Sequence, residues 1–410
     1  MGILKRFVAL LTASAAALTM LSFRSYAEEP KETGMGFIHA FGRTLYDDKG
    51  KEFIIKGMAF GNDVWSNPTS PPRFHHSEAS YKELSQLGFN SVRFYLNYSL
   101  FESDEKPYEY RSTGFDWLDT NIKWAGKYGI RLVLNMHYPQ GGYQSQGNGT
   151  LLWTDSENQK RLKALWTEIA RRYADEPVIL GYGLVNEPVP VGKTNVDEAL
   201  DMWKTLSNDI TASIREYDSR HLIFIEKANP KPYPGGETDW NVSLERSLPL
   251  QNSTNIVYEF HTYHPFLYTH QQFDWAGTVG EEHKYPDAGT GKAKLEESFR
   301  SIINFSEQNN VPIYCGEFGA GRHCFENGRG GAQWVSDMLD IFIGNHISFN
   351  YHTFNEYSFG FYYPDYSNGG LTRRNEELAA VFRRKLNTEQ TPRYEIVDIL
   401  FALLSCIKMQ

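Results

Sequence analysis

The segment ILGYGLVNEP, residues 179–188, is a run of apolar and small residues that ends in polar ones. A short run without charges, bounded by turn-forming residues, is typical of a strand buried on both faces of a parallel sheet. An amphipathic stretch of helical length, Asp197 to Tyr217, follows it. This part of the sequence therefore predicts one strand and one crossover helix of an α/β fold.

The same alternation recurs along the chain from Glu52 onward. The strand candidates are Phe53 to Phe60, Ser91 to Leu96, Arg131 to His137, Ile179 to Val185, Leu222 to Glu226, Ile256 to His261, Pro312 to Cys315 and Ser348 to Phe354. The helical stretches are Tyr81 to Leu87, Asp116 to Lys127, Asn158 to Tyr173, Asp197 to Tyr217, Lys294 to Asn309, Ala332 to Gly344 and Glu376 to Leu386. About eight parallel strands with helical crossovers close a barrel, so we predict an α/β fold, a single-domain (β/α)₈ TIM barrel.

A turn signal precedes the first of these strands. Residues 47–51, DDKGK, lie between β-prone flanks within the stretch Leu45 to Ile55. Such a cluster predicts a hairpin, which we expect to close the bottom of the barrel. No internal repeat or Pro-rich linker marks a second module.

The two ends of the chain differ in composition from the barrel. Lys5 and Arg6 precede an apolar run, and SYA at residues 25–27 offers a small-x-small cleavage site. An uncleaved anchor helix is the alternative, although the run is shorter than the roughly 20 residues that span a bilayer. We expect a signal peptide at 1–27, the catalytic barrel at 28–390 and a C-terminal tail of unknown role at 391–410. The mature protein is then exported, periplasmic or extracellular, without a stable membrane span.

The net charge of the chain indicates which class of macromolecule its surface can bind. The chain has 50 acidic and 41 basic residues, a formal charge of -9. Removing residues 1–27 deletes three basic residues and no acid, which takes the charge to -12. Such a surface repels nucleic acid and anionic membranes, whereas a neutral polysaccharide fits it. The sequence does not indicate the oligomeric state.

Three cysteines, Cys315, Cys324 and Cys406, form an odd set without repeated spacing. They imply neither a disulfide framework nor a zinc site. The sequence leaves open whether Cys315 and Cys324 are bridged or are two unpaired thiols near the barrel rim.

Two glutamates stand directly after apolar strand runs, which is where barrel enzymes carry their catalytic groups. Glu187 ends LVNEP at 184–188, and Glu317 lies in IYCGEFG at 313–319. Cleaving a glycosidic bond with retention requires two carboxyl groups about 5 to 5.5 Å apart, one to protonate the leaving oxygen and one to attack the anomeric carbon. The alternative for each residue is a solvated position at the rim.

At this point the sequence resembles glycoside hydrolase family 5, the old cellulase family A, from about Leu45 to Leu386. The fourth strand of that family ends in Asn-Glu-Pro and the seventh in Glu, an aromatic residue and Gly. The resemblance therefore implies that Glu187 is the general acid/base and Glu317 the nucleophile. It extends to Arg93 on the second strand, His137 ending the third, Asn186 beside the acid, and His261 with Tyr263 ending the sixth.

The supporting residues also have physical roles that do not depend on the family. A guanidinium such as that of Arg93 would keep Glu317 ionised. Asn186 would hydrogen-bond the 2-hydroxyl of the sugar. Tyr263 would donate to Glu317, and His261, two residues earlier on the same strand face, would line the same cleft. A structural ion pair for Arg93 and a strand cap for Asn186 are the plainer alternatives.

A zinc hydrolase built from the histidines is a competing interpretation. It is disfavoured because no His-x-His occurs on a strand and no His-Glu-x-x-His occurs in the chain. His261 and His264, three residues apart, would also face opposite sides of a strand. We therefore predict no metal and no cofactor.

Aromatic residues, 15% of the chain, gather after the predicted strand ends and suggest sugar-stacking subsites, with Trp65 and Trp240 among them. Family members usually carry a Trp on the eighth strand. Here His352 takes that position, with Phe354 as the other candidate, and this difference weakens any transfer of cellulase specificity. A Trp often precedes the Asn of Asn-Glu-Pro in the family, whereas Val185 precedes it here.

We therefore predict a retaining glycoside hydrolase of β-linked oligo- or polysaccharides, with β-1,4-glucan as the leading substrate. A β-mannanase, a β-1,3-glucanase or a β-glucosidase on the same scaffold are alternatives, as is transglycosylase action. A catalytically silent carbohydrate-binding barrel is the alternative from another class.

Overall fold

The computed structural model describes residues 34–65, 69–72, 75–145, 147–365 and 371–387. The chain divides into two units, residues 1–35 and 36–410, and every element named below lies in the second. The predicted signal peptide, the 391–410 tail and Cys406 lie outside the described residues. Within the described ranges, no helix is both long enough and apolar enough to cross a bilayer.

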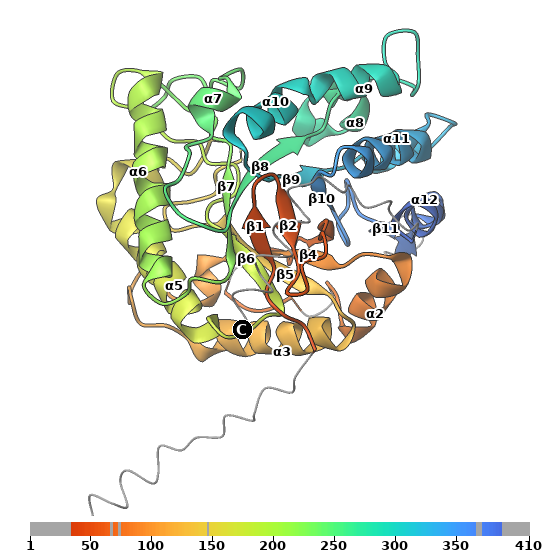
Figure 1. The fold of residues 1–410 in the computed structure, drawn as a ribbon. Helices are drawn as coiled ribbons and strands as arrows, with labels where there is room; N and C mark the ends of the chain where they lie inside the picture. The colour runs from red at the N-terminus through yellow and green to blue at the C-terminus, as the bar shows by residue number, and fades with distance from the viewer. Residues whose placement is uncertain (1–33, 66–68, 73–74, 146, 366–370, 388–410) are drawn as a thin grey trace, which may run out of the picture. The chain divides into compact units, whose positions relative to one another are not determined.

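Eight parallel strands form a closed barrel, as predicted (Figure 1). They follow one another around it in chain order, and the last pairs with the first. The strands are β3 (Lys56–Phe60), β4 (Ser91–Asn97), β5 (Arg131–Tyr138), β6 (Ile179–Gly183), β7 (Leu222–Glu226), β8 (Ile256–Thr262), β9 (Ile313–Phe318) and β10 (Ser348–Tyr351). Parallel order forces each connection to cross from one end of the barrel to the other, so all the carboxyl ends of the strands meet at one mouth.

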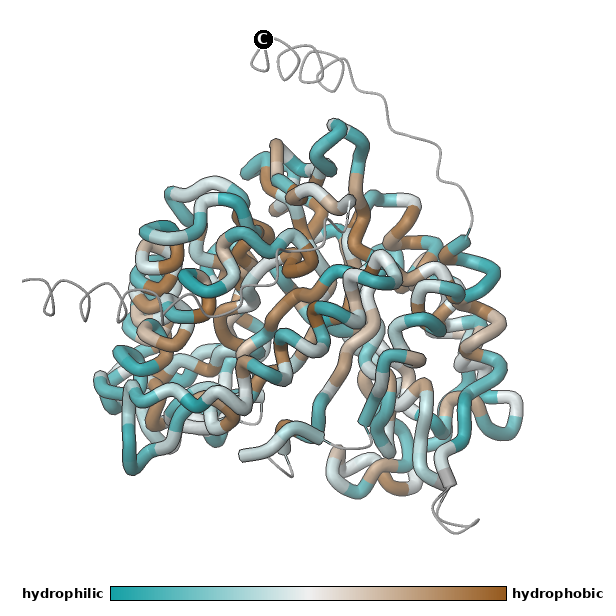
Figure 2. Tube along the Cα trace, turned by 90° about the horizontal axis from the view of Figure 1, so that it is seen from below, coloured by the Kyte–Doolittle hydropathy of each residue, from teal (hydrophilic) through white to brown (hydrophobic). Residues whose placement is uncertain are grey.

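Helices surround the barrel. The long ones are α2 (Glu78–Leu87), α3 (Ser112–Lys127), α5 (Ser156–Tyr173), α6 (Val196–Arg215), α9 (Lys292–Ser298), α10 (Arg300–Asn309), α11 (Gly331–Gly344) and α12 (Glu376–Leu386). Their amphipathic sequences explain their position, because apolar residues line the inner sides and polar residues the outer sides (Figure 2). The predicted helix Lys294 to Asn309 is two helices, which meet at Phe299.

Short elements fill the connections. They are η1 (Tyr98–Leu100), α4 (Leu151–Thr154), α7 (Leu244–Ser247), α8 (Phe266–Thr269), η2 (Asp274–Ala276) and η3 (Arg322–Phe325). An antiparallel pair, β11 (Tyr362–Asp365) with β12 (Leu371–Arg374), lies between β10 and α12. The sequence predicted none of these elements, and the last predicted strand, Ser348 to Phe354, ends earlier, at Tyr351.

A two-stranded hairpin lies at the amino-terminal end of the barrel. Its strands are β1 (His39–Phe41) and β2 (Thr44–Tyr46), which come before the predicted turn. The turn at 47–51 also forms, closed by a hydrogen bond of 2.9 Å from Asp47 N to Lys51 O. Hairpin residues pack into an apolar cluster inside the barrel, so the bottom is closed as expected. The buried residues of this cluster are Ile38, Leu45, Ile55, Val133, Leu180, Leu222, Phe224, Val257 and Tyr314.

Candidate active site

The two predicted catalytic glutamates meet at the carboxyl end of the barrel. Glu317 lies within β9, and Glu187 lies in the loop that follows β6. One carboxylate oxygen of each, together with a ring nitrogen of His261, lies within 4.8 Å of the others. This separation leaves room for one anomeric centre and no intervening water, which is the spacing of a retaining pair.

Glu317 is buried and held by three donors. Nη1 of Arg93 donates to Oε1 at 2.7 Å, the Tyr95 hydroxyl donates to the same oxygen at 2.6 Å, and the Tyr263 hydroxyl donates to Oε2 at 2.8 Å. Burial alone would raise the pKa of this carboxyl. The positive charges of His261, then His352 and Arg93, outweigh burial and hold the pKa of Glu317 well below its usual value. Glu317 is therefore ionised, as a nucleophile must be.

Glu187 has a different environment. Its side chain is 23% exposed, against 6% for Glu317. Its backbone has a φ of 41°, in the left-handed region that residues other than glycine seldom adopt. Nδ1 of His261 lies 2.9 Å from its Oε1. Glu187 thus has one imidazole partner and access to solvent, which suits a group that must exchange protons.

Arg93 and His261 are two positive groups of this site, and their side chains are 0% and 8% exposed. Besides Glu317, Arg93 Nη2 contacts Asn186 Oδ1 at 3.0 Å and Glu259 Oε1 at 2.9 Å. His261 Nε2 faces Glu226 Oε1 at 3.3 Å and Glu259 Oε1 at 3.4 Å. Burial lowers the pKa of His261, but the surrounding carboxylates, led by Glu226 and Glu317, raise it well above its usual value. His261 is therefore a cation that donates its Nδ1 proton to Glu187.

Two further predicted residues line the same centre. Both polar atoms of the Asn186 amide have partners. Oδ1 accepts a hydrogen bond from Arg93, and Nδ2 donates one to Ser145 Oγ at 3.0 Å. His137 is 2% exposed and stacks on Tyr95, with ring centroids 3.8 Å apart. Burial lowers the pKa of His137 well below its usual value, so its ring is neutral.

The eighth strand and the rim supply the remaining predicted residues. His352 Nδ1 lies 3.0 Å from the Tyr95 hydroxyl and 3.9 Å from Glu317, whereas Phe354 is buried against Phe60. His352, not Phe354, thus faces the catalytic pair. Trp65, 43% exposed, stands edge-on to His137 at 5.2 Å and borders the site.

Trp240 is not brought to this centre. It lies in the connection after β7 and is 54% exposed. Among the described residues, no hydrogen bond or ring contact joins it to either glutamate. Its role in binding substrate stays a prediction.

Sequence reasoning missed three side chains of the site. Tyr95 was two residues beyond Arg93 on the same strand face, and this spacing was the signal that would have found it. Glu226 closes a predicted strand, and Glu259 precedes His261 by the same two-residue step. Both are almost completely buried, at 3% and 1% exposure.

Distances alone would allow a metal ion beside His261, because two triads of carboxylates with this imidazole each lie within 4.8 Å. The contacts of the site also fit an ion-pair network without a metal. Both ring nitrogens of His261 face carboxylates, as the two N–H groups of an imidazolium would. Arg93 already supplies buried positive charge at the same place. We therefore assign these residues to an ion-pair network.

The two cysteines near the mouth are unpaired. Cys315 and Cys324 are both free and buried, which decides between the two alternatives left open by the sequence. Cys315 Sγ donates to the backbone oxygen of Glu317 at 3.3 Å, and Cys324 Sγ donates to that of Tyr268 at 3.1 Å.

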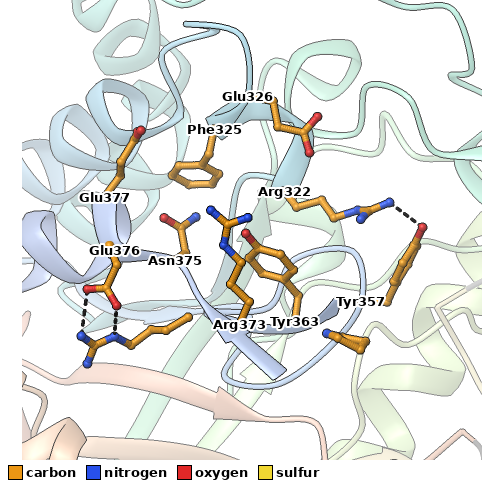
Figure 3. Close-up of a pocket in the computed structure, with 11 residues that line it drawn as sticks. Arg322, Phe325, Glu326, Tyr357, Tyr363, Arg373, Asn375, Glu376 and Glu377 are labelled. Atoms are coloured by element: carbon orange, nitrogen blue, oxygen red, sulfur yellow. Dashed lines mark hydrogen bonds and ion pairs between the residues drawn. The ribbon is translucent and has the colours of Figure 1, made fainter. Parts of the chain in front are cut away.

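A second hollow, of about 560 Å³, lies between η3, the loop after β10 and the β11–β12–α12 segment (Figure 3). Arg322 stacks over the Tyr357 ring at 4.0 Å, and Arg374 pairs with Glu376 at 2.8 Å. Its lining contains neither catalytic glutamate. This hollow is therefore separate from the catalytic centre, and three of the charged residues that line it, Glu326, Arg374 and Glu376, are in ion pairs.

Comparison with known proteins agrees with this geometry. The family model described as Cellulase (glycosyl hydrolase family 5) matches residues 46–358. Endoglucanase C of Acetivibrio thermocellus is 28% identical over 270 residues, which cover 59% of this chain and 74% of that protein. Cellodextrinase A of Ruminococcus flavefaciens is 28% identical over 272 residues, covering 65% and 76%. The crystal structure of endoglucanase Cel5A from Thermotoga maritima superposes with a TM-score of 0.63 at 26% identity, covering 80% of this chain and 96% of that one.

Proposed function

The chain belongs to the cellulase family, glycosyl hydrolase family 5, and from this premise we propose that it is a retaining endo-β-1,4-glucanase in which Glu187 is the acid/base and Glu317 the nucleophile. The observation that carries the assignment of roles is the asymmetry of the pair. Both carboxylates lie within 4.8 Å of each other, but only Glu317 is buried among cations and hydroxyl donors. The more exposed Glu187 is the partner that exchanges protons.

In the first step, Glu187 gives its proton to the glycosidic oxygen while a Glu317 oxygen attacks the anomeric carbon. The bond from that carbon to the leaving oxygen breaks, and a glycosyl–Glu317 ester forms. Attack consumes the negative charge of Glu317, and Arg93, Tyr95 and Tyr263 then have a weaker acceptor. These three donors regain a charged acceptor in the second step, when the carboxylate re-forms.

In the second step, Glu187, now a carboxylate, takes a proton from water, and the resulting hydroxide attacks the anomeric carbon from the face that the leaving group occupied. The ester bond to Glu317 breaks. Two inversions give net retention. His261 donates to Glu187 throughout and stabilises its carboxylate form between the two steps.

The β-1,4-glucan preference is supported by the names of several relatives, among them endoglucanases and a cellodextrinase. Export is supported by the signal pattern of residues 1–27. His352 in place of a Trp platform changes the floor beside Glu317, so the width of the specificity must be measured. Mannan, β-1,3-glucan and small β-glucosides are the matched substrates to compare.

The test is a panel of polysaccharides and aryl β-glycosides in which the anomer of the first product is read by NMR. We expect soluble β-1,4-glucan to be cut internally and to give the β-anomer, with no turnover by Glu317→Ala. An α-anomer would overturn retention. Turnover confined to mannan or to β-1,3-glucan would overturn the substrate, and equal inactivity of wild type and Glu317→Ala on the whole panel would favour a silent carbohydrate-binding barrel.

A further inference from the structure

Two buried carboxyl groups lie beneath the catalytic pair and take no part in the mechanism above. Glu226 closes β7, and Glu259 is its Cα partner on β8. Their side chains are 4% and 1% exposed. One oxygen of each lies within 4.8 Å of the other and of a ring nitrogen of His261. They form an acidic pair enclosed by the barrel.

The pair faces charged groups from every neighbouring strand. Arg93 approaches from β4, His261 from β8, Glu317 from β9 and Glu187 from the loop after β6. Below it, the Tyr314 hydroxyl is buried without a hydrogen bond within the described structure. The ammonium of Lys227 is held by Asn229 Oδ1 at 2.7 Å. Arg93 and His261 thus contact the acidic pair directly, and Lys227 lies near enough to act on Glu226.

We propose that Glu226 and Glu259 share a single proton, so that the pair supplies one negative charge to Arg93 and His261 and thereby acts as a positioning element for both catalytic glutamates. Two carboxylates this close in a buried site repel each other, which favours a single negative charge on the pair. Their contacts differ accordingly. Glu259 Oε1 is 2.9 Å from Arg93, whereas Glu226 Oε2 is 3.6 Å away and makes no hydrogen bond.

The protonation of Glu226 agrees with this assignment. Burial, aided by the neighbouring charge of Glu259, raises the pKa of Glu226 well above its usual value. Glu226 then holds the shared proton, and Glu259 carries the charge. With Glu317 ionised and Glu187 protonated, the negative charges of Glu259 and Glu317 balance the positive charges of Arg93 and His261.

The backbone of β9 is built around this carboxyl. Gly316, directly before the nucleophile, lies so close to Glu259 that an added Cβ would be 1.8 Å from Oε1. A side chain at position 316 would therefore displace the carboxyl of Glu259. The lack of space beside Glu259 thus explains the glycine in the stretch IYCGEFG without any argument from charge.

If the two carboxyl groups share one proton, the effects on kcat of replacing each of them should not add. Glu226→Gln and Glu259→Gln each leave one carboxyl, which then ionises and replaces the lost charge, so we expect kcat within about threefold of wild type. The double variant has an excess positive charge. We expect its kcat to fall about a hundredfold or more, and the alkaline limb of kcat/KM to move down by about one pH unit, because positive charge releases the catalytic proton earlier.

Infrared spectroscopy tests the same idea without a substrate. At alkaline pH, where exposed carboxyl groups are ionised, wild type should show the carbonyl band of a protonated carboxylic acid. That band should be absent from both single variants. A band that survives in either single variant, or is missing from wild type, overturns the proposal, as do single losses that add up to the loss of the double variant.

The kinetic experiment rests on the proposed roles of Glu187 and Glu317, whereas the infrared experiment does not. Inactive wild type that shows the band would therefore count against the proposed function and support the shared proton. Glu102→Gln is the matched control. Glu102 is also fully buried, is paired with Arg161 at 3.0 Å and lies outside this network. The Glu102→Gln variant should keep both the infrared band and the pH profile. Thermal unfolding shows whether each variant folds.

Discussion

The lower and upper halves of the barrel interior are built from the same strands but differ in kind. On β7 the inward-facing side chains are Leu222, Phe224 and then Glu226, and on β8 they are Val257 and then Glu259 and His261. Lower members pack in the apolar cluster, and upper members belong to the ion-pair network. One two-residue step along a strand separates a hydrocarbon core from a centre of buried charge.

The difference teaches where stability and chemistry reside. Apolar side chains below bury area without needing partners, which favours folding. Charged side chains above each require a counter-charge, and their desolvation is costly even when paired. Substitutions that change the net charge of the upper half should therefore change rate, and substitutions in the lower half should change the free energy of unfolding.

The largest effect is expected for the nucleophile. Glu317→Ala removes the group that forms the covalent intermediate, so kcat should fall by about 10⁴-fold or more. Azide added to this variant would occupy the vacated space and give an α-glycosyl azide, which NMR identifies. If Glu187→Ala gives the α-azide instead, the two roles are exchanged.

Loss of the acid should have a smaller effect that depends on the leaving group. Glu187→Gln removes protonation of the glycosidic oxygen, which is worth about 10² to 10⁴-fold on a polysaccharide. An aryl glycoside with an acidic phenol needs little protonation, so its first step should be nearly unaffected. Burst kinetics measure that step, and equal losses for both kinds of substrate would contradict the assignment.

The lower half should respond in stability. Phe224→Ala leaves a cavity beside Tyr314, whose ring centroid lies 5.1 Å away. We expect a loss of about 3 to 5 kcal/mol in the free energy of unfolding, measured by denaturant titration. The kcat/KM of the folded variant should stay within about twofold of wild type, and a large fall in kcat would show that the two halves are coupled.

The smallest expected effect is a shift in pH dependence. Glu317 acts as a carboxylate, so activity is lost as pH falls through its pKa, which lies well below 4.5 in wild type. The charge of His352 contributes to that lowering. His352→Gln should therefore raise the pKa of Glu317 and move the acid limb of kcat/KM to higher pH. An unchanged acid limb would remove His352 from the electrostatics of the nucleophile.

Part of this architecture could be predicted from the sequence for a simple reason. Charge-free runs such as ILGYG mark buried parallel strands, and a polar residue directly after such a run must lie at the mouth. This reasoning located Glu187 and Glu317. It assigned Arg93 and Tyr263 to Glu317, and both contacts form.

The acidic pair was missed, although Glu259 lies two residues before His261 and therefore on the same strand face. For Glu226, which stands at a strand end, the sequence does not show whether the side chain turns to solvent or into the barrel. The register of neighbouring strands decides it, and between β8 and β9 the register shifts beside Glu317. The direction of Trp240, in a long connection without strand periodicity, was beyond prediction for the same reason.

The buried thiol of Cys315 has a practical consequence for handling the protein. It lies two residues before the nucleophile, yet burial raises its pKa well above its usual value, so it stays an S–H group. Alkylating reagents and mild oxidants attack thiolates that they can reach. Treatment with a maleimide or a mild oxidant should therefore leave Cys315 unmodified and the centre chemically untouched.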